Sequence, residues 1–204
     1  MNIIIQSTAA TMRKQANRVW RQRGLTAIEL IIGLSIIALV MAGVASTART
    51  MFRDQKINSE VARLQLMQQK LRAYYSTSNT TTGVSANVAV TIGAVSPDAV
   101  GGSSGSWTIV SKFGELVTLG STTLGSLANN AITISYAGVP QVECINFIKA
   151  AGPSFDAVCT GGSESSPSAN IKSYGQNTPI DNATVENACP SAGTTSIQFT
   201  MQRQ

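Results

Sequence analysis

The sequence predicts an α+β protein, in which a long N-terminal α-helix precedes a globular head with a mainly antiparallel β-sheet. Two observations predict the helix: there is no proline between Leu25 and Tyr75, and no charged side chain from Leu30 to Ala48, a run of 19 residues. After Ser76 the composition changes to short segments rich in β-branched residues, separated by glycine, serine and asparagine. That pattern is typical of strands and turns, and it predicts the sheet.

The long helix is predicted to have two different halves. Its charge-free run is close to the roughly 20 apolar residues that cross a bilayer as a helix. After Arg49 the apolar residues instead recur three, four or seven positions apart, which places them on one face. This stripe consists of Ile57, Val61, Leu64, Leu71 and Tyr75. One continuous helix of this length extends about 75 Å and needs packing partners along its length.

The first 24 residues have the character of a processing segment. They hold 5 of the chain's 15 basic residues and no acidic ones, so 10 basic residues remain against 10 acidic residues, and the net charge of +5 belongs to this leader. A basic flank beside an apolar span is a positive-inside topology signal, which places the head outside the cytoplasm. This explanation is favoured over nucleic-acid binding.

Glu29 distinguishes between the alternative explanations of the apolar run. A cleaved secretory signal has a shorter apolar core, although residues 42–45 resemble its small-residue cleavage site. A plain signal anchor fits the length and the basic flank. Neither predicts a carboxylate near the start of the run, where ionised groups are costly and usually mark a functional partner. A cut between Gly24 and Leu25 would create an amino group four residues before Glu29; the other interpretation is a Glu29 that reaches the lipid headgroups.

The segment from Arg23 to Ile31 resembles the cleavage and methylation motif of type IV prepilins. It has a glycine before the cut, a hydrophobic residue after it and a glutamate at the fifth mature position. The resemblance implies that a prepilin peptidase cuts after Gly24 and N-methylates Leu25. It also implies that Glu29 pairs with the terminal amine of a neighbouring subunit in a filament. Pseudopilins of type II secretion systems and minor pilins share this motif.

The head is predicted to contain a hairpin, further strands and two short helices. Residues 88–95 fit a helix or a strand. The segment 120–126 has Walker-like glycine spacing without the required lysine, and a loop is expected there. The predicted elements are a hairpin of 107–110 with 115–119, strands at 131–136, 155–159 and 196–201, a helix from Pro140 to Gly152 and a helix over 181–189.

Three cysteines lie in the predicted extracytoplasmic part, where disulfide formation is expected. Spacing alone allows three pairings. The order of elements resembles the type IVb pilins, as do the 24-residue leader and Leu25. In that subclass a cysteine on a short helix after the middle strands bonds one just before the final strand. The resemblance therefore implies a bond between Cys144 and Cys189, which leaves Cys159 as a buried strand thiol or a partner in another bond.

Enzymatic and cofactor-dependent functions are not expected. The chain has no histidine and no paired C-x-x-C spacing, so neither a zinc site nor a Ser-His-Asp arrangement is predicted. No catalytic residue, metal or cofactor is assigned.

The predicted organisation is a removed leader (1–24), a long helix (25–75) and a pilin head (76–204). By resemblance, the chain is the major pilin of a type IVb pilus used for adhesion, aggregation or conjugative DNA transfer. The implied partners are further copies in a homopolymer, the peptidase, an assembly ATPase, an inner-membrane platform, an outer-membrane secretin and a surface receptor. The chain would sit in the inner membrane with a periplasmic head before assembly and on the cell surface afterwards. Alternatives are a pseudopilin, a minor pilin and a single-pass membrane protein that never polymerises.

Overall fold

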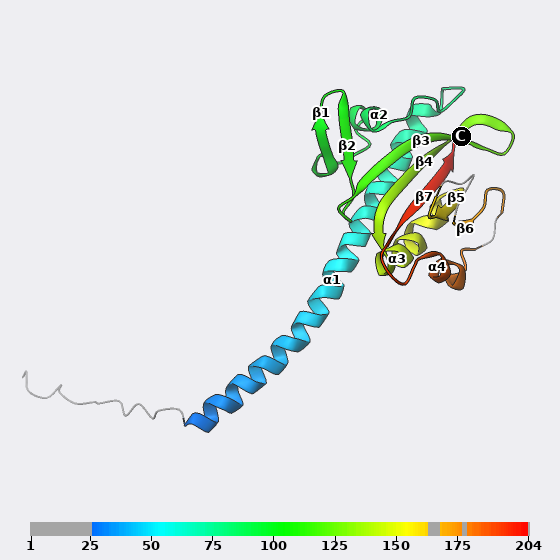
Figure 1. Cartoon of the computed structure of the whole chain (residues 1–204). Helices are drawn as coiled ribbons and strands as arrows, with labels where there is room; N and C mark the ends of the chain where they lie inside the picture. The colour runs from blue at the N-terminus through cyan, green and yellow to red at the C-terminus, as the bar shows by residue number, and fades with distance from the viewer. Residues whose placement is uncertain (1–25, 163–167, 177–178, 204) are drawn as a thin grey trace, which may run out of the picture. The chain divides into compact units, whose positions relative to one another are not determined.

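The computed structural model describes residues 26–162, 168–176 and 179–203 (Figure 1). The chain divides into two compact units between Thr47 and Ala48, and each is described by itself. The predicted cleavage site at Gly24 and Leu25 lies outside the described residues.

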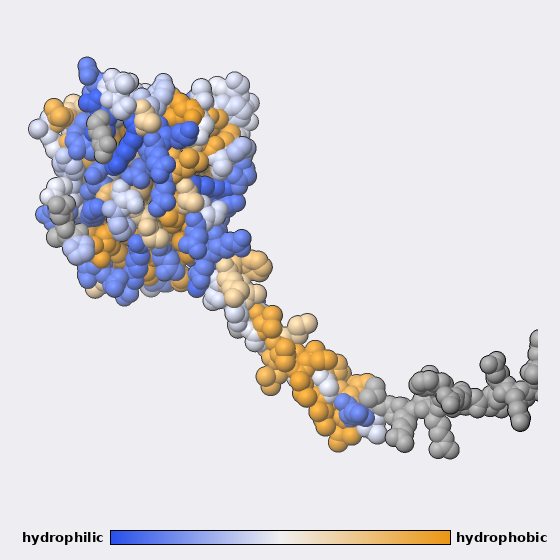
Figure 2. Space-filling model, turned by 180° about the vertical axis from the view of Figure 1, so that it is seen from behind, coloured by the Kyte–Doolittle hydropathy of each residue, from blue (hydrophilic) through white to orange (hydrophobic). Residues whose placement is uncertain are grey.

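Helix α1 (Ala27–Tyr75) has 49 residues, as the absence of proline predicts. In the first unit its side chains are exposed from Ala27 to Val44, apart from a half-buried Gly33. The described residues contain one helix long and apolar enough to cross a membrane, and it is this one, with a mean hydropathy of 2.5 over its most apolar window. Figure 2 shows hydrophobic side chains covering the visible face of this part of α1.

In the second unit α1 buries one face. Because an α-helix has 3.6 residues per turn, apolar residues three or four positions apart form a single stripe. The stripe predicted from the sequence is buried except for Val61, which is half-buried, and it also includes a residue that was not predicted, Met67. The buried apolar residues are Ile57, Leu64, Met67, Leu71 and Tyr75.

The head contains a seven-stranded, fully antiparallel sheet, which confirms the predicted fold class. The strand order is β1-β2-β3-β4-β7-β5-β6, so the C-terminal strand β7 lies between β4 and β5. The strands are β1 (Val100–Ser103), β2 (Ser106–Val110), β3 (Leu116–Leu124), β4 (Leu127–Pro140), β5 (Ala157–Thr160), β6 (Ala169–Lys172) and β7 (Thr194–Gln202).

Short helices connect the strands. Asp181 is the N-cap of α4, where its carboxylate accepts a hydrogen bond from the Thr184 N–H at 3.0 Å. The helical elements after α1 are α2 (Ala86–Thr91), η1 (Pro97–Ala99), α3 (Gln141–Ala151), η2 (Gly152–Ser154) and α4 (Asn182–Ala188). The segment 88–95, which the sequence left open between helix and strand, therefore begins as a helix.

The predicted hairpin is present, with Ile109 paired with Val117. The loop predicted over 120–126 is wrong, because β3 continues to Leu124 and only Gly125 and the next residue turn the chain. Glycine is needed at position 120, where a Cβ atom would lie 2.9 Å from Thr133 Oγ1 on the neighbouring strand. Gly120 thus reflects close packing within a strand, whereas Gly125, with a φ of +70°, lies in the turn. Strand β6 was not predicted, since it has only four residues and two of them, Asn170 and Lys172, are polar.

Aromatic side chains fill the core between the sheet and its covering helices. The rings of Tyr136, Phe147 and Phe199 meet edge to face, with centroids 5.0–6.1 Å apart. Such arrangements are favoured by the ring quadrupoles. Phe147 comes from α3 and the other two from neighbouring strands, so α3 is fixed to β4 and β7.

Candidate assembly site

Glu29 lies in the first turn of α1 and is exposed. It is the only charged side chain among the described residues up to Ala48. A carboxylate is electrostatically favoured at a helix N-terminus, where backbone N–H groups are unpaired. The position predicted for the assembly residue is therefore compatible with the helix and open to a partner.

The apolar side chains that follow Glu29 are exposed to an unusual degree. Ile28 is 67% exposed, Leu39 77% and Val44 59%. Two hydroxyl groups in this segment bond within the helix: Ser35 Oγ donates to Ile32 O at 2.8 Å and Thr47 Oγ1 to Gly43 O at 3.1 Å. A helix that satisfies its own polar groups is suited to lipid or to a bundle of apolar helices.

A buried charge network ties the second half of α1 to the head. Glu60, 2% exposed, accepts hydrogen bonds from the Lys112 backbone N–H at 3.0 Å and from Arg63 Nη1 at 3.3 Å. Arg63 also pairs with Asp98, which receives Lys112 Nζ at 3.1 Å. Glu60 is therefore neutralised inside the head, whereas Glu29 has no such partner within the described residues.

Burial raises the pKa of Tyr136 well above its ordinary value of 10.0, and the negative charge of Glu60 raises it further. A phenol surrounded by an apolar core and an anion strongly favours its neutral form. This contact belongs to the packing of α1 against β4.

A disulfide joins Cys144 on α3 to Cys189, the residue that ends α4. The S–S distance is 2.01 Å and the Cα atoms are 6.0 Å apart, which is within the normal range. This is the pairing that the resemblance to type IVb pilins implies. Cys159 is buried in β5 and takes no part in this disulfide.

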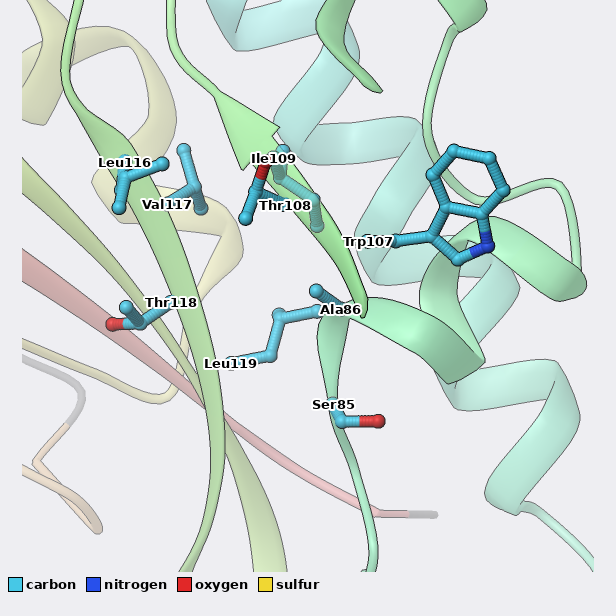
Figure 3. Close-up of a pocket in the computed structure, with 9 residues that line it drawn as sticks. All are labelled: Ser85, Ala86, Trp107, Thr108, Ile109, Leu116, Val117, Thr118 and Leu119. Carbon is cyan, nitrogen blue, oxygen red and sulfur yellow. The ribbon is translucent and has the colours of Figure 1, made fainter. Parts of the chain in front are cut away.

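A notch of about 240 Å³ opens where β2 and β3 diverge (Figure 3). Only two residue pairs join these strands, and beyond them Leu119 of β3 points towards Ala86, the first residue of α2. The side chain of Asn87 satisfies the facing edge of β2, since its Oδ1 accepts from the Trp107 N–H at 2.8 Å and its Nδ2 donates to Gly105 O at 2.9 Å. No ionisable side chain lines this notch, so the hydroxyl groups of Ser85, Thr108 and Thr118 have no acid or base among the lining residues to activate them.

The described residues contain no group of three His, Cys, Asp or Glu side chains able to hold a metal ion. The features that stand out are therefore the exposed apolar helix with Glu29 at its start and the sheet head closed by one disulfide. Together they define a class of protein that holds an exposed apolar helix in a membrane or against other apolar helices.

Comparison with known proteins agrees with this class. The family model described as PilS N terminal matches residues 54–202, so the chain belongs to this family. No curated protein matches the chain.

Among the solved structures that share the fold are two type IV pilins. One is TcpA, a type IV pilin from Vibrio cholerae El Tor biotype, at 20% identity and a TM-score of 0.55, covering 72% of this chain and 98% of that chain. The other is the type IV b pilin from Salmonella typhi, at 17% identity and a TM-score of 0.54, covering 71% of this chain and 99% of that chain. The predicted resemblance to type IVb pilins is confirmed.

Proposed function

We propose that the chain is the major structural subunit of a type IVb pilus, cut after Gly24 and N-methylated at Leu25 by a prepilin peptidase. The observation that carries this proposal is the segment from Leu30 to Val44, whose large apolar side chains are more than half exposed and follow a single exposed carboxylate. Burying this surface between subunits yields roughly 25 cal/mol per Å² of apolar area removed from water. The cohesion of a filament would come from this term.

Glu29 would set how the subunits are staggered. In a bundle of apolar helices an unpaired carboxylate costs several kcal/mol, and an ammonium group beside it relieves that cost. Cleavage after Gly24 supplies such an ammonium group at Leu25. Only one axial offset between neighbouring helices places the amine of one copy beside Glu29 of the next.

The remaining partners follow from the same proposal. Residues 1–24 would be removed, residues 25–75 would form the membrane-stored helix and residues 76–204 the periplasmic head. An assembly ATPase and an inner-membrane platform would extract subunits, and a secretin would pass the filament through the outer membrane. Adhesion, aggregation or DNA transfer would then depend on receptors for the exposed loops.

Mass spectrometry and one charge substitution test the proposal. The purified protein should begin at a methylated Leu25, and Glu29→Gln should be processed normally but yield few filaments. Glu186→Gln, which removes an exposed head carboxylate near Lys149, is the matched control and should assemble normally. An intact leader, a cut near Ala45, or normal filaments from Glu29→Gln would contradict the proposal.

The shared cleavage motif is also compatible with two related functions, a pseudopilin of a type II secretion system and a minor pilin. The composition of isolated filaments separates them from a major pilin. A major pilin is the principal protein of the filament, a minor pilin a small fraction of it, and loss of a pseudopilin stops protein secretion.

A further inference from the structure

This inference rests on the proposed function and concerns how one head meets the next. An open helical polymer needs a heterologous contact, in which one surface of a subunit binds a different surface of its neighbour. The β3–β4 hairpin has two ends, and each carries exposed apolar residues beside charges of one sign.

The tip patch, at the turn of the hairpin, consists of Leu127, Tyr174 and Arg203. Leu127 is 62% exposed and Tyr174 38%. Tyr174 lies against the turn, with its Cε1 atom 3.4 Å from where a Gly125 Cβ would be. Figure 1 shows the chain's C-terminus beside this turn.

Two hydrogen bonds hold the tip patch together. The Tyr174 hydroxyl donates to Gln202 Oε1 at 2.9 Å, and the Arg203 N–H donates to Asn130 O at 2.9 Å. These bonds place Arg203 and Tyr174 at the end of the sheet where Leu127 begins β4.

The base patch, at the opposite end of the hairpin, consists of Glu115, Leu116, Val142 and Glu143. Leu116 begins β3 and is 49% exposed, while Val142 follows the end of β4 and is 42% exposed. The stem of Glu115 lies over Gly138, whose φ of +63° and lack of a side chain permit the contact.

The charges of the two patches are opposite and available. Within the described residues no ion pair engages Arg203, Glu115 or Glu143. The charged side chains beside the base patch already have partners. Lys112 pairs with Asp98, and the Lys56 Nζ atom lies 5.2 Å from the ring centroid of Phe113.

Beside the tip patch, the carboxylate of Asp156 also has a partner, because it forms an ion pair with Arg72 at 3.2 Å. The tip patch is thus basic and apolar, and the base patch is acidic and apolar. Two tip patches facing each other would bring like charges together, and so would two base patches, which disfavours a two-fold contact.

We propose that the tip patch of one subunit docks on the base patch of the next copy of this chain. The contact buries Leu127 and Tyr174 against Leu116 and Val142, and it sets Arg203 beside Glu115 and Glu143. Because the two surfaces differ, the contact repeats without closing, as a filament requires.

Disulfide crosslinking tests this contact in assembled filaments. The variant Leu127→Cys with Leu116→Cys should give a ladder of covalent multimers after mild oxidation, whereas Leu127→Cys alone should give none. Normal filaments without the ladder would overturn the inference, and so would a ladder from Leu127→Cys alone. Absence of filaments from the unmodified chain would instead contradict the proposed function.

A charge exchange gives an independent test. Arg203→Glu should lower filament yield several-fold while the head keeps its thermal melting temperature. Combining it with Glu115→Arg and Glu143→Arg should restore the yield, because the signs are then exchanged across the contact. Failure of this rescue in a folded triple variant would overturn the inference.

Discussion

The two halves of α1 have the same secondary structure and opposite relations to the rest of the chain. In the first unit none of the most apolar window is buried. In the second unit Leu64 and Leu71 are fully buried and even a carboxylate, Glu60, lies inside. The difference teaches that helix formation and helix burial are separate questions. The striped half is covered by its own sheet, and the uniformly apolar half must find lipid or other subunits.

The carboxylates of the two halves of α1 differ in the same way. Glu60 is compensated within the chain by Arg63 and by the Lys112 backbone. Glu29 receives no such compensation from the described residues. A carboxylate that is paired within its own fold needs no outside partner, whereas one that is left open can select a partner.

The comparison is tested most severely by one matched pair of substitutions. Leu64→Asp places a charge in the core and should prevent the head from folding, since a buried unpaired carboxylate costs several kcal/mol. Leu39→Asp should leave the head folded but remove the protein from the membrane fraction, at a cost of about 3 kcal/mol for insertion. Urea unfolding and membrane fractionation measure the two effects. A head that unfolds in Leu39→Asp would break the comparison.

The next largest effect concerns the disulfide that closes the head. Its sequence separation is 45 residues, so removing it with Cys144→Ala and Cys189→Ala should cost on the order of 4 kcal/mol in the chain-entropy model. Denaturant unfolding checks this value. Cys159→Ala is the control and should lose less, because no covalent loop is opened. Equal losses would show that the bond adds nothing beyond packing.

A smaller effect is expected at Gln68, a buried polar residue on the striped face. Its Nε2 donates to Ser154 O at 2.7 Å, so Gln68→Ala should cost about 1–3 kcal/mol by leaving that carbonyl unpaired. Ser35→Ala, which removes a hydroxyl from the apolar half, should leave head stability unchanged in the same unfolding measurement. If Ser35→Ala lowered the stability of the head, the apolar half would contribute to that stability, which would contradict the comparison.

The smallest effect appears only in alkali. The raised pKa of Tyr136 means that the folded head keeps the phenol protonated while the unfolded chain ionises near 10.0. The stabilisation is therefore present below pH 10 and declines as pH rises above it, by about 1.4 kcal/mol per pH unit for one proton. Tyr136→Phe should show a shallower decline between pH 10 and 11. Identical slopes would mean that the phenol titrates normally.

Much of this architecture could be predicted because its causes are local. The helix follows from the missing proline, its two halves from the change in hydrophobic period after Arg49, and strands β4 and β7 from alternation of apolar residues. Loops were more difficult to predict from the sequence than helices and strands. The glycine spacing over 120–126 predicted a loop, because a glycine needed for close strand packing and one needed in a loop look the same in sequence.

The sequence by itself determined the long helix, the division between its apolar and striped halves, and the isolation of Glu29 among uncharged residues. Tertiary structure alone decided that β7 enters between β4 and β5, that Cys144 bonds Cys189, and that Glu60 is buried beside Arg63. The physical reason is the distance along the sequence over which each kind of interaction acts. Periodicity and charge act over a few residues, whereas strand order and pairing depend on contacts between segments distant along the chain.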